Sequence, residues 1–197
     1  MIVNGFVALG FVGGLAVAPG FIDVHTHDDW AVLQSPAMEC KITQGLTTVI
    51  AGNCGISAAP FTPRNGLPAP FGIVPGIAEH SFGSVEQYAK AVDLVAPAVN
   101  VMLLAGHSSL RVEVMGRDSD RASNGDEIAQ IAVLLDQALA QCACVLSSGL
   151  DVYPYAGCSR ALIERFVSSV REINMIWSEP HLEKAICMLD KFAIDWG

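Results

Sequence analysis

Short apolar runs alternate with segments of helical periodicity along most of this chain, and this alternation constrains the fold more than any other feature. Buried strands are predicted at 21–27, 47–51, 99–105 and 144–148. Helices are predicted at 32–44, from 84 to about 96, and over 124–139. A strand–helix–strand rhythm predicts βαβ units, with a parallel sheet and right-handed crossovers. In such sheets, the chemistry gathers at the carboxyl ends of the strands.

Two of the predicted helices begin at a capping signature. Ser84 is followed three residues later by Gln87, and Asn124 is followed at the same spacing by Glu127. The segment 53–83, between the second strand and the first of these helices, is rich in proline and glycine and too long for a simple connector. It is interpreted as a lid or substrate loop.

Composition and charge exclude two classes of protein. The chain has 197 residues, of which 52% are hydrophobic and 16% charged, which excludes a disordered protein. Its net charge is −9 and it contains no basic run, which argues against binding to nucleic acid. The six cysteines form no Cys-x-x-Cys pair, so they are interpreted as reduced thiols of a cytoplasmic protein.

A membrane segment is the alternative for the uncharged stretch Gly5–Ile22. The first basic residue is Lys41, so the positive region of a signal peptide is missing. The stretch also contains five glycines before Phe21, which favour turns and short strands over a spanning helix. We therefore expect no membrane association.

Two histidines close the first predicted strand. Because side chains alternate along a strand, Asp23, His25 and His27 are predicted to share one face, where two imidazoles can converge on one cation. The alternative is a pair of surface histidines beside the acidic Asp28 and Asp29.

A cysteine follows the second predicted strand, in the run Gly52-Asn53-Cys54-Gly55. A thiolate exposed at a strand terminus can complete a zinc site, whereas a lone cysteine in an apolar setting is more often an inert core thiol. Together with the histidines of the preceding strand, Cys54 is a candidate third ligand.

These segments resemble the N-acyl-D-amino-acid deacylases (D-aminoacylases), a branch of the metal-dependent amidohydrolases with a TIM-like barrel. The resemblance is carried by Ala18–Asp29 (APGFIDVHTHDD) and Thr43–Ser57 (TQGLTTVIAGNCGIS), and extends to Gly106–Arg111 (GHSSLR) and Ser147–Leu150 (SSGL). The Gly-Asn-Cys-Gly element is specific to this branch, because most amidohydrolases place a carbamylated lysine where it uses a cysteine.

The resemblance implies a zinc-dependent hydrolase acting on non-peptide carbon–nitrogen bonds, which converts N-acyl-D-amino acids to a carboxylate and a free D-amino acid. It makes His25 and His27 ligands of one metal position and Cys54 a ligand or bridge of the zinc site. In the same way, Tyr153 and Ser159 are expected to bind the amino-acid carboxylate of the substrate.

The chain departs from the family after Leu150. The segment that follows resembles one lying well downstream in the family, beyond two strands that each supply a zinc-binding histidine, and no residue matches the catalytic Asp. We therefore predict an incomplete TIM-like (β/α) barrel: 1–17 as a remnant of the N-terminal small β domain or a leader strand, 18–150 as the first four β/α units, and 151–197 as a late fragment joined after an internal deletion.

The predicted deletion has two consequences for function. Turnover by the shortened chain is not expected, because the groups that hold the main zinc and move the proton act as a unit. Unpaired barrel edges predict self-association. The alternative function is that of a non-catalytic metal-binding or subunit-interaction remnant.

Overall fold

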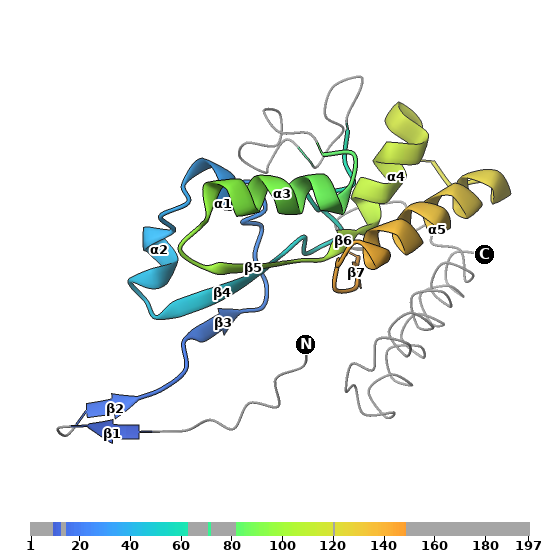
Figure 1. The fold of residues 1–197 in the computed structure, drawn as a ribbon. Coiled ribbons are helices and arrows are strands. Elements are labelled where there is room, and N and C mark those ends of the chain that lie inside the picture. The colour runs from blue at the N-terminus through green and yellow to red at the C-terminus, as the bar shows by residue number, and fades with distance from the viewer. Residues whose placement is uncertain (1–9, 13–14, 63–70, 72–81, 120, 149–197) are drawn as a thin grey trace, which may run out of the picture.

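The computed structural model describes residues 10–12, 15–62, 71, 82–119 and 121–148 (Figure 1). The strands are β1 Gly10–Val12, β2 Leu15–Val17, β3 Phe21–Asp23, β4 Leu46–Ala51, β5 Asn100–Leu103, β6 Ala105–Gly106 and β7 Leu146–Ser147. The helices are α1 Ala31–Gln34, α2 Glu39–Ile42, α3 Val85–Val95, α4 His107–Met115 and α5 Gly125–Ala140, with a 3-10 turn at Gly116–Asp118.

The parallel sheet that the sequence predicts is present. Strands β3, β4 and β5 are parallel neighbours in that order, and β6 pairs in parallel with β7. The crossover from β3 to β4 runs through α1 and α2, and that from β4 to β5 through α3. The α/β class is therefore confirmed. The strands of the described residues form one three-stranded sheet and two two-stranded sheets, and no closed barrel.

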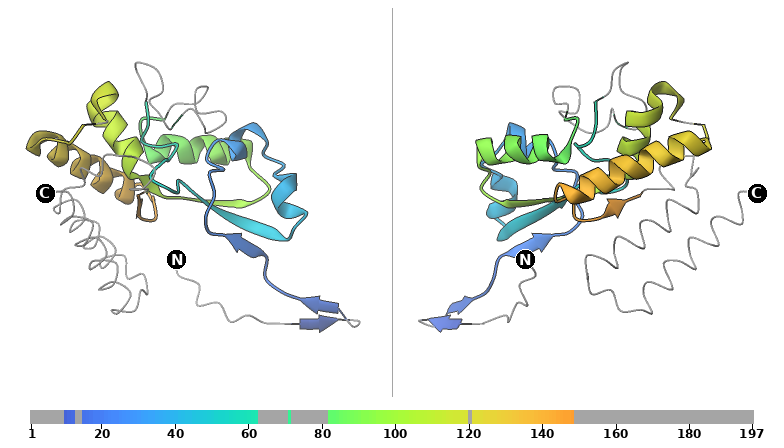
Figure 2. Two further views of the ribbon diagram at one scale, coloured as in Figure 1. Left: turned by 180° about the vertical axis from the view of Figure 1, so that it is seen from behind. Right: turned by 45° about the vertical axis from the view of Figure 1, so that its right-hand side comes forward.

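The N-terminal stretch forms strands, as its glycines indicate. Strands β1 and β2 make an antiparallel hairpin in which Gly10 lies opposite Val17, and the hairpin extends away from the helices and the three-stranded sheet (Figures 1 and 2). None of the helices in the described ranges has the length and apolar character needed to cross a membrane.

The prediction of one continuous helix at 32–44 is wrong. It is divided into α1 and α2, because Pro36 disfavours a helical conformation at Ser35 and cannot donate a backbone hydrogen bond. The carbonyl of Pro36 instead accepts a hydrogen bond from the backbone of Ala98 at 2.8 Å. The break thus ties the first crossover to the segment that leads into β5.

The strand predicted at 99–105 is also divided. The backbone N–H of Leu104 still donates to Ala51 of β4 at 2.9 Å, whereas that of Ala105 donates to Val145, next to β7, at 2.8 Å. The chain therefore changes its pairing partner at this point. Helix α4, which follows directly, was not among the predicted elements.

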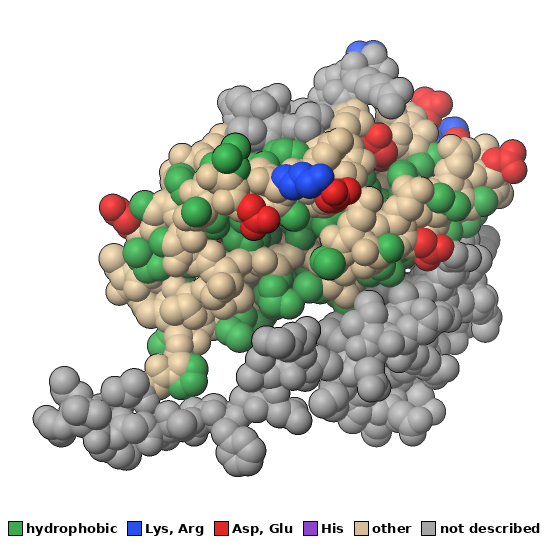
Figure 3. All heavy atoms as spheres, in the orientation of Figure 1, with side chains coloured by type: hydrophobic (Ala, Val, Ile, Leu, Met, Phe, Trp, Pro, Cys, Tyr) green, Lys and Arg blue, Asp and Glu red, His purple; other side chains and the backbone are tan. Residues whose placement is uncertain are grey.

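Helices cover one face of the three-stranded sheet (Figures 1 and 2). On that face, Val49 and Ala51 of β4 and Leu103 of β5 are buried. The opposite face leaves apolar side chains in contact with solvent: Ile22 of β3 and Met102 of β5 are 57% and 41% exposed, and Val24, which follows β3, is 64% exposed. Hydrophobic side chains are visible along the lower side of the described part in Figure 3.

The long loop that begins after β4 is closed at its base. Phe61 and Phe82 form an antiparallel bridge, with backbone hydrogen bonds of 2.7 and 3.1 Å. Most of the segment between them lies outside the described residues, and so does the junction between Leu150 and Asp151. The lid interpretation and the predicted deletion therefore stay predictions.

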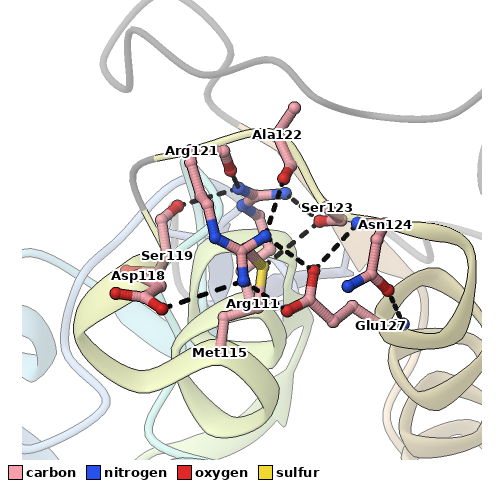
Figure 4. A network of polar contacts seen from close by, with 9 residues as sticks. All are labelled: Arg111, Met115, Asp118, Ser119, Arg121, Ala122, Ser123, Asn124 and Glu127. Carbon is pink, nitrogen blue, oxygen red and sulfur yellow. Dashed lines mark hydrogen bonds and ion pairs between the residues drawn. The ribbon is translucent and has the colours of Figure 1, made fainter.

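A polar network fixes the start of α5 against α4 (Figure 4). The side chain of Asn124 accepts from the backbone of Glu127, and the Glu127 carboxylate accepts from the backbone of Asn124, so the predicted capping box is confirmed. Buried Arg111 of α4 donates to the carbonyls of Ser119 and Arg121 at 2.8 and 2.6 Å. The loop between the two helices is thus held from both sides.

The stability supplied by Glu127 should depend on pH. Hydrogen bonds from Arg121, and then from the backbone of Asn124, lower the pKa of Glu127 from 4.5 to about 2. Because the folded-state pKa is depressed, the contribution is present above pH 4.5 and is lost as the pH falls towards 2. We expect Glu127→Gln to be less stable than the parent at pH 7, with the difference closing across this window.

Urea unfolding at a series of pH values checks this expectation. Asp126→Asn is the matched control, because it removes a carboxylate from the same helical turn and keeps Glu127. A destabilisation by Glu127→Gln that is the same at pH 7 and pH 3 would contradict it.

Candidate metal centre

Two neighbouring strands deliver the predicted metal-binding residues to one edge of the sheet. His25 and His27 follow β3, and Cys54 follows β4, which is parallel to it. Beyond the end of β3, the backbone N–H of Thr26 still donates to Ile50 of β4 at 3.2 Å. The histidine segment therefore stays alongside β4 as both chains leave the sheet.

His25, His27 and Cys54 form a compact cluster. The Nε2 atom of His25 lies 3.2 Å from the Sγ atom of Cys54, and one ligand atom of each residue lies within 4.8 Å of the other two. Two ligands of one tetrahedral zinc, at about 2.1 and 2.3 Å from the metal, are about 3.6 Å apart. The donor set and the spacing thus fit one zinc ion after small rotations of the exposed imidazoles.

The electrostatic environment favours the neutral form of His27. Partial loss of hydration around the ring, followed by the nearby charge of His25, lowers the pKa of His27 below its ordinary value of 6.5, and Asp28 opposes this shift. The neutral imidazole is the form that coordinates a metal. His27 is therefore ready to act as a ligand at neutral pH.

The loop that carries Cys54 has an unusual backbone. Gly52, Cys54 and Gly55 have φ angles of 83°, 53° and 78°, in the left-handed region. A Cβ atom at Gly52 would lie 2.4 Å from the carbonyl oxygen of Leu104. Glycine at position 52 thus provides both the backbone angle and the close approach to Leu104, which lies between β5 and β6.

The side chain of Asn53 holds this loop to the histidine segment. The amide of Asn53 donates to the carbonyl of Ile50 at 2.8 Å and to that of Thr26, between the two histidines, at 3.3 Å. The motif residue next to Cys54 therefore links the two segments that bear the candidate ligands.

Strand β7 and helix α4 hold the other side of the loop. The hydroxyl of Ser147 donates to the carbonyl of Gly52 and accepts from the backbone of Gly55 at 3.2 Å. The backbone N–H groups of Ser108 and Ser109, in the first turn of α4, donate to the carbonyl of Gly55 at 2.8 and 3.2 Å. Cys54 is thus held from several directions.

Asp29 is a buried part of this assembly. Its carboxylate accepts from the backbone of Gly52 and of Ala58, both at 2.9 Å, while its carbonyl accepts from the Tyr88 hydroxyl at 2.8 Å. Burial raises the pKa of Asp29 to about 7, opposed by the backbone hydrogen bonds. Sequence reasoning missed its role, and only its position two residues after His27 hinted at one.

The prediction that Asp23 shares a face with the two histidines is wrong. Strand β3 ends at Asp23, so the alternation of side chains does not continue to His27. The Asp23 carboxylate instead pairs with Lys41 at 2.8 Å, and this hydrogen bond lowers its pKa. Lys41 also pairs with Asp28 at 2.8 Å, so it bridges the two ends of the histidine segment.

His107 does not belong to the cluster. It is the first residue of α4, is buried, and places Nδ1 3.5 Å from the hydroxyl oxygen of Ser148. Burial, and then the charge of Arg111, lowers the pKa of His107 to about 4, so it is neutral at pH 7. The two predicted substrate-binding residues, Tyr153 and Ser159, lie outside the described residues.

Parallel strands that end at two histidines and a cysteine define an α/β protein with a candidate metal centre at its sheet edge. A profile of the amidohydrolase family matches residues 12–146. The chain belongs to this family.

The relatives agree with the branch that the motifs indicate. D-aminoacylase of Alcaligenes xylosoxydans xylosoxydans is 42% identical over 163 residues, which are 83% of this chain and 33% of that protein. A solved D-aminoacylase, described with a binuclear metal centre, matches at a TM-score of 0.70 and 40% identity, over 78% of this chain and 32% of its own.

A third match is the N-acyl-D-glutamate deacylase of Bordetella bronchiseptica, solved with zinc and a phosphonate mimic of the tetrahedral intermediate. It has a TM-score of 0.71 and 36% identity, and the match covers 78% of this chain and 32% of that one. The resemblance to the N-acyl-D-amino-acid deacylases is confirmed. The chain spans about a third of the length of these relatives.

Proposed function

We propose that this chain carries part of the metal centre of a zinc-dependent deacylase of N-acyl-D-amino acids, built on the first units of a TIM-like barrel in a cytoplasmic protein. The observation that carries the proposal is the cluster of His25, His27 and Cys54. Its donor set suits zinc, and it lies where parallel strands end. The named activities and metals of the relatives support the same reaction.

The protein's own residues have distinct roles in this proposal. His25 and His27 offer neutral nitrogen donors, and Cys54 offers a thiolate. A bound zinc would lower the pKa of water and polarise the acyl carbonyl, so that the water oxygen bonds to the acyl carbon, the amide C–N bond breaks, and a proton from the water passes to the leaving amine. Tyr153 and Ser159 are proposed to orient the substrate's carboxylate.

Zinc binding and ligand binding test this function on the full chain. Equilibrium dialysis should give one zinc per chain at micromolar or weaker affinity, since three ligands are gathered in the described part. Calorimetry with a phosphonate analogue of an N-acyl-D-amino acid should then show binding that needs zinc and favours the D enantiomer. We expect no release of D-amino acid from N-acetyl-D-methionine.

The results of these binding and activity measurements support or overturn the proposed function. A chain that takes up no zinc, or that binds both enantiomers of the phosphonate equally, would overturn the proposed function. Zinc-dependent release of D-amino acid would support the function and show that the predicted lack of turnover is wrong.

A second candidate function is favoured by the exposed apolar face. Ile22, Val24 and Met102 are each more than one-third exposed, as in a surface that associates with another subunit. A non-catalytic metal-binding or interaction protein would bind zinc, would not bind the phosphonate and would sediment as an oligomer. The same calorimetry, combined with sedimentation, separates the two candidates.

A further inference from the structure

Asp29 connects the two segments that carry the candidate ligands. Its backbone lies two residues beyond His27, while its carboxylate reaches the loop of Cys54. The side chain is completely buried. A buried carboxylate is unfavourable unless its oxygens are satisfied, so its position needs an explanation.

The carboxylate of Asp29 accepts hydrogen bonds from residues on both sides of Cys54 in the sequence. One oxygen accepts from the backbone of Gly52, two residues before the cysteine, and the other accepts from Ala58, four residues after it; both distances are 2.9 Å. The carboxylate therefore closes the base of the loop and fixes where the thiol projects.

The backbone of Asp29 is fixed from a third element. The hydroxyl of Tyr88, on α3, is buried and donates to the carbonyl of Asp29 at 2.8 Å. Tyr88 thus fixes the backbone of Asp29, whose carboxylate in turn binds the Cys54 loop. Any shift of the Asp29 backbone would be passed to Gly52 and Ala58 through the two carboxylate oxygens.

We propose that Asp29 is a positioning residue of the metal centre, whose carboxylate holds the Cys54 loop in reach of His25 and His27. This role rests on the proposed function, because it assumes that these three residues bind a metal. It predicts that Asp29 controls metal affinity without touching the metal.

The test uses Cd²⁺ as the probe, because its bond to a thiolate gives a charge-transfer band in the ultraviolet. The signal of interest is the part of the band that Cys54→Ala removes from the full chain. In Asp29→Asn, one oxygen becomes an amide that cannot accept a hydrogen bond. We expect its Cd²⁺ affinity to fall about 10-fold to 100-fold, in the range known for groups that orient metal ligands.

Two control variants isolate the positioning effect. Asp93→Asn removes an exposed carboxylate from α3, the helix that carries Tyr88, and keeps the loop contacts, so it measures the loss of one negative charge and should change affinity by less than about 3-fold. Leu135→Ala destabilises the core of α5 and should leave Cd²⁺ affinity unchanged at temperatures where it stays folded.

The outcomes distinguish this inference from the function on which it rests. If the parent shows no band that depends on Cys54, both fall. If the parent shows the band and Asp29→Asn binds as tightly, only the positioning role is overturned. Should Asp29→Asn fail to fold, Tyr88→Phe decides, since it keeps the carboxylate and should weaken Cd²⁺ binding by about 2-fold to 5-fold through the loss of one hydrogen bond.

Discussion

Zinc affinity should fall by more than about 100-fold when Cys54 is replaced by alanine, since the loss of a group that merely orients a ligand already costs about 10-fold to 100-fold. Cys54 is the candidate ligand of the cluster that would bind as an anion, and its Sγ atom lies 3.2 Å from Nε2 of His25. Alanine leaves two neutral imidazoles, which attract a divalent cation more weakly than a set that includes a thiolate.

Equilibrium dialysis of the parent and Cys54→Ala measures this effect. Cys40→Ala is the matched control, because Cys40 is an exposed thiol of α2 and does not belong to the cluster. Binding should also release a proton and strengthen as the pH rises, because a thiol coordinates as the thiolate. An unchanged affinity in Cys54→Ala, or an equal loss in Cys40→Ala, would contradict the assignment.

The parts of the fold that the sequence predicts well depend on local patterns. The run TTVIA is apolar and β-branched and forms most of β4, because such residues suit a strand buried on one face. The capping signature at Asn124 marks the start of α5 for a similar reason, since both partners lie within one helical turn. Local signals also place His25 and Cys54 at the ends of neighbouring strands.

The parts that the sequence does not predict depend on distant contacts. Asp29 accepts from residues 23 and 29 positions away, and no local pattern separates it from a surface acid. The division of the strand at Leu104 arises because the chain changes its partner from β4 to β7, which only the three-dimensional arrangement determines. The ion pair of Asp23 with Lys41 is another such contact, because the two residues lie 18 positions apart in the chain.

A single methyl group at Gly106 should disturb both the fold and the metal centre. A Cβ atom there would lie 2.5 Å from the carbonyl oxygen of Gly55 and 2.7 Å from the backbone nitrogen of Ser57. These neighbours are backbone atoms, which cannot rotate away as a side chain would. We expect Gly106→Ala to lower the free energy of unfolding by about 2–3 kcal/mol, as inserted methyl groups do in close-packed sites.

The comparison with Gly125→Ala separates this steric effect from the general preference for alanine over glycine. Gly125 is the first residue of α5, a Cβ atom there would meet nothing within 4 Å, and alanine should therefore be neutral or stabilising by up to about 1 kcal/mol. Gly106 has φ −81° and ψ 123°, angles that alanine adopts readily, so backbone strain cannot explain a loss there. Because Gly55 directly follows Cys54, Gly106→Ala should weaken zinc binding as well. Urea unfolding and dialysis on both variants measure the two effects, and a stable Gly106→Ala that binds zinc like the parent would show that the loop does not need this close contact.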